Sequence, residues 1–174
     1  LAPGDYCYRI ERWKLKGLSS RETLAYGISS FGDGIIFQAD ESETIFQYVM
    51  RRGRDWDYVD SDTEALLAAH RSLEEVLNAR FSDAVKDFDI ENITAYQIKV
   101  QRVEGFFNRR IEQHKQRIRT LRESGRDRMI RPAEGLLRSA ETNKEQRLNE
   151  LKEKMTLDME QAQVAAGVFR VLRS

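Results

Sequence analysis

Hydrophobic and polar residues alternate along the first 38 residues, which predicts short antiparallel strands. Tyr6 and Tyr8 are two residues apart, which places them on one face of a strand. The alternation then shifts by one residue, so that Trp13 and Leu15 continue it. The segment ETLAYGISS repeats the alternation, and IIFQ at 35–38 follows a glycine-containing turn. We therefore expect two or three strands with polar outer faces.

Two shorter helices are predicted next. Asp40 with Glu43 resembles a capping pair, and Gly53 is a natural end for the helix that follows. Ser61 with Glu64 forms an S-x-x-E capping box in front of a second helix. The apolar face of that helix carries Leu66, Leu67, His70, Leu73 and Leu77.

A long helical hairpin is predicted from Asp89 onward. The first arm has a heptad seam interrupted by a four-residue step at 103–107–111, and the second arm has the same irregularity around Lys144. Folding the chain at Gly125–Arg126 places the two irregularities opposite each other, which favours an antiparallel coiled coil. Its arms cover about 90–123 and 128–160, and Pro132 falls in the first turn of the returning helix.

In this fold-back Leu121 meets Ile130 and Ile118 meets Ala133. The C-terminal segment VAAGVFRVL is β-branched and apolar, so we expect a buried strand that returns to the opening sheet. The predicted class is α+β: a small antiparallel sheet closed by the C-terminal strand, with a long protruding coiled-coil hairpin. The expected organisation is a β-rich subdomain at 1–60, a helical region at 61–163 and the C-terminal strand at 164–174.

Charge is distributed unevenly along this hairpin. The chain is neutral, with 29 basic and 29 acidic residues, yet the segment 109–140 holds ten basic and four acidic ones. Its local charge is therefore about +6, and the remaining chain sums to about −6. The candidate nucleic-acid-binding residues are the basic ones that helical geometry places along the flanks and turn of the far half of the hairpin: Arg110, Lys115, Arg117, Arg119, Arg122, Arg126, Arg128, Arg131 and Arg138.

Two interpretations of this charge stay open. A coiled coil keeps charges on its solvated face, so the segment can be basic without a ligand. Alternatively, clustered guanidinium groups bind phosphates with little sequence information. No aromatic residue lies among these charges, so a duplex backbone is a better target than stacked single-stranded bases. A membrane surface is less favoured, because the apolar face is committed to the partner arm.

Enzymatic chemistry has little support in the sequence. There is no G-x-x-x-x-G-K-[ST] loop for phosphates, no paired-cysteine metal site and no nucleophile with a base nearby. Asp55 and Asp57 around Trp56 could serve a metal, but a loop that docks Trp56 into a core is favoured. We expect no catalytic residue, no metal and no cofactor.

His114 and Cys7 are interpreted as core residues. His114 lies in the hairpin seam, and the other histidine, His70, is predicted on a different helix without ligand partners. Cys7 is expected to be a small buried hydrophobe in a strand. A single cysteine, with no apolar run near the length of a membrane span, fits a reducing cytoplasm.

The series RVEGFFNRRIEQHKQRIRTLRESGRDRMIRPAEGLLRSAETNKEQRLNELKEKM, followed by QVAAGVFRV, resembles the C-terminal extension of large bacterial Swi/Snf-type helicase-like ATPases. Several such proteins occur in phage-defence operons. The resemblance covers roughly residues 62–172, and it implies a motor of two RecA-like lobes upstream, which this chain lacks. It therefore implies a fragment without ATPase activity of its own. The expected role is a non-catalytic accessory domain that contacts DNA backbone through the hairpin tip. The alternative is a coiled-coil arm that docks a protein partner.

Overall fold

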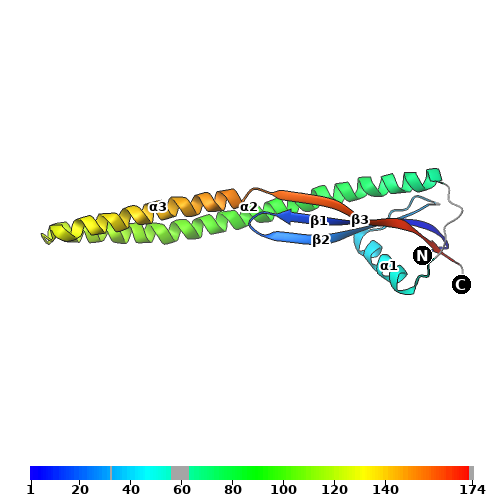
Figure 1. Cartoon of the computed structure of the whole chain (residues 1–174), viewed down its shortest axis with the longest axis horizontal. Helices are drawn as coiled ribbons and strands as arrows, with labels where there is room; N and C mark the ends of the chain where they lie inside the picture. The colour runs from blue at the N-terminus through cyan, green and yellow to red at the C-terminus, as the bar shows by residue number, and fades with distance from the viewer. Residues whose placement is uncertain (32, 56–62, 173–174) are drawn as a thin grey trace. The chain divides into compact units, whose positions relative to one another are not determined.

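The computed structural model describes all residues except 32, 56–62 and 173–174. Its elements are β1 (Gly4–Lys16), β2 (Ser20–Ser30), α1 (Ala39–Arg52), α2 (Thr63–Glu123), the 3-10 helix η1 (Asp127–Met129), α3 (Ile130–Lys154) and β3 (Asp158–Val171) (Figure 1). The predicted α+β class is confirmed. Two compact units emerge: a sheet unit of 1–16, 20–88 and 158–174, and a hairpin unit of 17–19 and 89–157.

The sheet has three antiparallel strands in the order β2-β1-β3. β1 pairs with β2 from Tyr6↔Ser30 to Lys16↔Ser20. It pairs with β3 on its other side, where the register shifts between Ile10 and Glu11. Of the two or three N-terminal strands expected, β1 and β2 form, whereas Ile36 in the segment 35–38 makes only an isolated bridge with Ser29.

Both faces of β1 are covered over its first half, so the prediction of polar outer faces holds only farther along, where the Arg12 and Lys14 side chains are each 40% exposed. Alternation continues along β1 without the expected shift, which places Cys7, Trp13 and Leu15 on the face opposite Tyr6. Tyr6 packs with Ile28 and Phe169 beneath the apolar side of α1, whereas Cys7 packs beneath α2. Buried residues therefore occur on both faces, with Tyr6 and Ile10 on one and Cys7, Trp13 and Leu15 on the other, which a single alternating pattern cannot describe.

Local sequence signals mark both ends of α1, but the capping residue at its N-terminus is not the expected one. The capping residue is Gln38, whose backbone N–H donates to Glu41 at 3.2 Å, so the Asp40–Glu43 pair is wrong. Gly53 ends the helix as predicted, and its N–H donates to the Val49 carbonyl at 2.7 Å. The box predicted at Ser61 lies outside the described residues.

The N-terminal part of α2 packs on the sheet through fully buried Leu73 and Leu77. Gly27 of β2 permits this approach, because a Cβ there would lie 3.3 Å from both leucine side chains. Leu67 was predicted on the same face, but it is 53% exposed, and Ala69 is buried instead.

α2 continues unbroken into the hairpin unit. The predicted second short helix and the first hairpin arm are thus one helix of 61 residues. No proline and only one glycine, Gly105, occur between Thr63 and Glu123, so nothing local ends it.

α3 runs antiparallel beside the C-terminal part of α2 (Figure 1). Ile118, Leu121 and Ala133 form one buried cluster against which Ile130 and Leu137 pack. Farther from the turn, Lys144 Nζ donates to Asn108 Oδ1 at 3.0 Å.

The C-terminal boundaries differ from those predicted. α3 ends at Lys154 rather than near residue 160, and β3 begins at Asp158 rather than at 164. The apolar spacing through Met155 and Met159 suggested helix, yet residues 158–163 pair with β1. Tertiary pairing therefore overrides the local helical pattern.

Candidate nucleic-acid interface

The end of the hairpin is built on a helix-terminating turn at Gly125. Gly125 has φ +68°, a left-handed conformation that glycine adopts without a Cβ penalty. The Arg126 N–H donates to the Leu121 carbonyl at 3.0 Å, and the Gly125 N–H donates to the Arg122 carbonyl at 3.2 Å. This pair of bonds is a Schellman motif, which ends α2 sharply. It places Arg126, and Arg128 in η1, at the very end of the hairpin.

The two arms hold the remaining predicted cations. Their inner sides meet through the buried Ile118, Leu121 and Ala133, so the charged residues are left on the outside. The nine predicted binding residues are all exposed: Arg110, Lys115, Arg117, Arg119, Arg122, Arg126, Arg128, Arg131 and Arg138.

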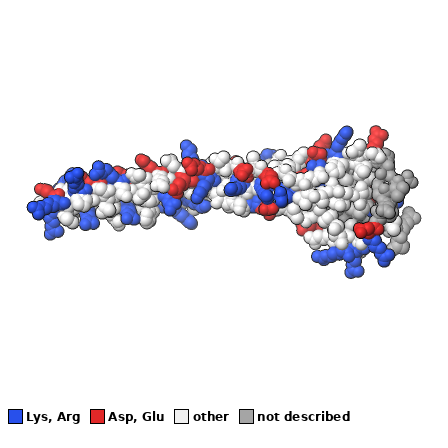
Figure 2. Space-filling view, viewed as in Figure 1, with Lys and Arg blue, Asp and Glu red and all other residues white. Residues whose placement is uncertain are grey.

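These nine residues do not all lie equally close to the turn. With a rise of about 1.5 Å per residue, Arg110 lies roughly 24 Å from Arg126 along the axis of the arm. Arg138 is likewise more than two turns into α3. We therefore define the tip cluster as the six arginines nearest the turn: Arg117, Arg119, Arg122, Arg126, Arg128 and Arg131. Figure 2 shows basic side chains grouped at this end of the hairpin.

Few of these charges have an acidic partner. Arg122 Nη2 lies 3.0 Å from Glu134 Oε1, with both side chains substantially exposed. Among the described residues, the other five arginines of the tip cluster form no ion pair. An exposed pair contributes little to stability, so even Arg122 remains exchangeable toward an external anion. The tip cluster therefore presents guanidinium donors to solvent.

A second basic group was missed by inspection of the sequence. Lys99 and Arg102 of α2 line a pocket together with Arg147 and Lys154 of α3. Along the sequence these residues alternate with acids such as Glu104 and Glu153, so no local run of charge marks them. Only the pairing of the two arms brings the cations together. They could have been found by comparing the positions that face each other across the predicted fold-back.

The other candidate groups have mainly structural environments. Cys7 is fully buried as predicted, and burial raises the pKa of its thiol to about 11. Asp55 is exposed, whereas Trp56 and Asp57 lie outside the described residues. His114 is partly buried in the hairpin unit, and its Nε2 has no hydrogen-bond partner in the described structure. Within the described ranges, no three His, Cys, Asp or Glu side chains group in a way that could hold a metal ion.

No described helix has the length and apolar character needed to span a membrane. No family model matches the chain, and no curated protein and no solved structure matches it. The candidate interface therefore rests on the geometry and charge of the hairpin.

Proposed function

We propose that this chain is a non-catalytic module that binds the backbone of duplex nucleic acid through the tip cluster. The observation that carries the proposal is the set of exposed arginines at the hairpin end, of which only Arg122 has an acidic partner among the described residues. Guanidinium groups bind phosphate oxygens as bidentate donors, and several of them together displace condensed counterions. Such contacts position a duplex without reading its sequence.

The arm that carries the tip cluster is, in this proposal, an antiparallel coiled coil. The shared cluster of Ile118, Leu121 and Ala133 supports that view, as does the Lys144–Asn108 hydrogen bond near the predicted irregularity of the seam. Paired helices are stiffer than a single helix. The tip arginines would thus meet a duplex from a pre-organised surface.

The proposed setting is the C-terminal accessory domain of a bacterial helicase-like ATPase. It is motivated by the resemblance of the hairpin and closing strand to the extension of Swi/Snf-type proteins, including those of phage-defence operons. In that setting ATP hydrolysis belongs to upstream motor lobes in the cytoplasm, and this module holds DNA while the motor moves. The chain itself would then need neither a cofactor nor a catalytic residue.

The test is binding of a fluorescent DNA duplex by anisotropy over a series of salt concentrations. Wild-type affinity is expected to fall linearly on a log–log plot, with a slope of about 0.9 per phosphate contacted. Replacing Arg119, Arg122, Arg126 and Arg128 with Ser should lower both the affinity and that slope. The matched control replaces four exposed arginines of the sheet unit with Ser: Arg51, Arg52, Arg54 and Arg71.

Each result has a definite meaning. If the control variant loses affinity as strongly as the tip variant, binding reflects overall charge and the proposed site is wrong. If wild-type protein fails to bind at low salt, the proposed function is wrong. The alternative function would then apply, in which the hairpin is an arm that docks a protein partner.

A further inference from the structure

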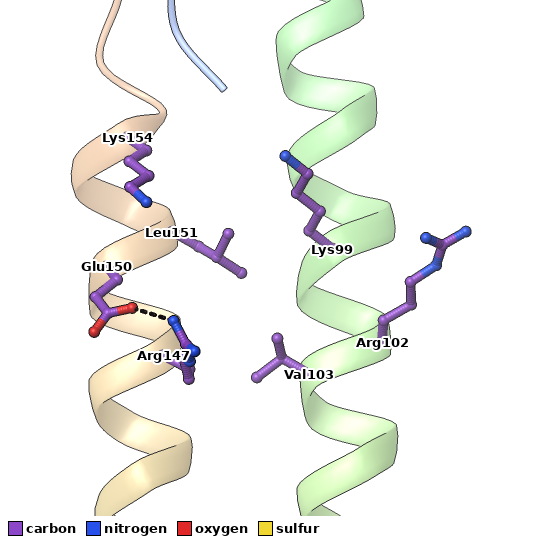
Figure 3. A pocket seen from close by; sticks show the side chains of 7 residues that line it. All are labelled: Lys99, Arg102, Val103, Arg147, Glu150, Leu151 and Lys154. Carbon is purple, nitrogen blue, oxygen red and sulfur yellow. Dashed lines mark hydrogen bonds and ion pairs between the residues drawn. The ribbon is translucent and has the colours of Figure 1, made fainter. Parts of the chain in front are cut away.

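The second basic group surrounds a hollow with an apolar floor. The pocket, of about 270 Å³, lies between α2 and α3 in the hairpin unit. Val103 and Leu151 point toward each other from the two helices and form the floor (Figure 3). Lys99 of α2 and Lys154 of α3 lie near one end of this space. The pocket thus combines a small apolar depression with cations from both arms.

Most of this positive charge is uncompensated. The one acidic residue of the lining, Glu150, is 2.8 Å from Arg147. The hydrogen bond from Arg147 lowers the pKa of the Glu150 carboxyl, and the charge of Lys154 adds to the effect, so Glu150 stays ionised and paired. Lys99 and Lys154 form no ion pair in the part of the chain that the structure describes. The rim therefore favours a ligand that carries negative charge.

The apolar surface continues along α2 beyond the pocket. A second hollow, of about 450 Å³, is lined by Ile98, Gly105 and Arg109, and it shares Arg102 with the first. Space at Gly105 is open, since a Cβ there would have no heavy atom within 4 Å. Ile98 is 45% exposed and the neighbouring Phe106 is 51% exposed. Exposed apolar residues flanked by arginines extend the depression into a strip.

A pocket of this size is below the range of about 300–1,000 Å³ that encloses drug-sized ligands. It suits one apolar side chain, inserted as an anchor and surrounded by polar contacts, as in protein interfaces. Phosphodiester backbone has no apolar group that would use the Val103–Leu151 floor. An acidic peptide segment supplies both the negative charge and the apolar group. Its carboxylates contact the lysines, while one of its apolar side chains is buried in the pocket.

We propose that the Val103–Leu151 pocket is a docking site for an acidic protein segment that inserts an apolar anchor residue. This site is separate from the tip cluster. Val103 is about 18 residues, or roughly 27 Å, from Leu121 along α2. One chain can therefore contact nucleic acid at its tip and a protein partner nearer the other end of the hairpin.

The probe is a random peptide display library, selected on the full 174-residue chain, with enriched peptides then synthesised and measured by anisotropy. The pocket variant carries Lys99→Glu and Lys154→Glu. A matched control carries Lys152→Glu and Lys86→Glu, which make the same charge change on helical residues outside the pocket. Leu151→Ala tests the floor separately, and thermal unfolding confirms that each variant is folded.

Enriched peptides are expected to share an apolar residue flanked by Asp or Glu. They should bind the pocket variant and Leu151→Ala at least tenfold more weakly than wild type, while the control retains wild-type affinity. Absence of enrichment, peptides without acidic residues, or equal affinity for the pocket variant would each overturn the proposal. If the pocket variant instead loses duplex DNA as strongly as the tip variant, the strip belongs to a nucleic-acid surface, and the protein site is rejected while the proposed function stands.

Discussion

The side-chain amide of Asn92 donates a hydrogen bond to the main-chain carbonyl of Met155 across 2.9 Å. The Oδ1 atom of the same amide accepts the Leu18 N–H at 2.8 Å, and the residue is only 2% exposed. Gly17 lies so close that a Cβ there would be 2.6 Å from Oδ1. Asn92 therefore ties the β1–β2 connection and the end of α3 to the middle of α2, all within the hairpin unit.

Asn92→Ala should destabilise this unit, because two partly buried backbone groups would lose their hydrogen-bond partner. The expected loss is about 1–3 kcal/mol in the free energy of unfolding, measured by urea denaturation with circular dichroism. Asn149→Ala, an exposed asparagine on α3, serves as the control and should change stability little. Equal effects of the two substitutions would show that the bridging bonds contribute nothing.

Local signals explain what the sequence could predict of the fold. Gly125 ends α2 in a left-handed conformation, and Pro132 lies in the first turn of α3, since each effect depends on a residue's own backbone preferences. Gly53 ends α1 for a different local reason, because a Cβ there would lie 2.5 Å from the Val49 carbonyl oxygen. The tip cluster was likewise visible as a local run of charge. These features need no knowledge of distant residues.

Other features depend on partners far away in sequence. β3 begins at Asp158 because β1 supplies a pairing edge, although the spacing of Met155 and Met159 continues a helical pattern. The bridging role of Asn92 cannot be read from one polar residue on a helix. The Val103–Leu151 pocket similarly exists only once two arms are paired. Non-local packing, rather than weak propensity, set the limit of prediction.

Asp5 of β1 and Arg170 of β3 form an ion pair that should make the sheet unit sensitive to acid. Arg170 donates through Nε and Nη2 to the two carboxylate oxygens, with Nη2 to Oδ2 at 2.7 Å. These hydrogen bonds lower the pKa of Asp5 below its ordinary value of 3.8. Because the pKa of Asp5 is lower in the folded state, its stabilisation is complete above the ordinary value of 3.8. It is lost as the pH falls through the folded-state pKa.

Asp5→Asn should therefore be less stable than wild type at neutral pH, and the difference should shrink as the pH drops below about 3.8. Urea denaturation over a pH series measures both curves. Asp83→Asn, which removes an exposed acid on α2, provides the comparison. A difference between Asp5→Asn and wild type that stays constant with pH would rule out this linkage.

Cys7 should resist thiol reagents in the folded protein. It is fully buried, and burial raises its pKa from 9.0 to about 11, so little reactive thiolate is present near neutral pH. A thiol-specific chromogenic reagent should react at least tenfold more slowly with native protein than with protein in denaturant. Because the folded pKa is raised, the associated stability is complete below pH 9 and is lost toward pH 11, a loss that Cys7→Ala should lack. Rapid labelling of the native protein would contradict the buried position.

His114 carries an unmet polar atom in the hairpin unit. Its Nε2 is buried, and the described structure provides it with no hydrogen-bond partner, while Ile118 one turn later is packed in the apolar cluster. An unpaired buried polar atom costs about 1–3 kcal/mol, so an apolar side chain of similar size should be favoured here.

His114→Leu should therefore raise the free energy of unfolding by about 1 kcal/mol or more, measured by urea denaturation. His70→Leu tests whether removing a histidine as such has this effect, because His70 belongs to the sheet unit and its buried atoms are not left unpaired in the described structure. His114→Ala separates the two contributions at the site, since it removes the polar atom but leaves a cavity, and it should be less stable than His114→Leu. If His114→Leu instead destabilises the chain, Nε2 acquires a partner in solution and the histidine is a stabilising part of the hairpin.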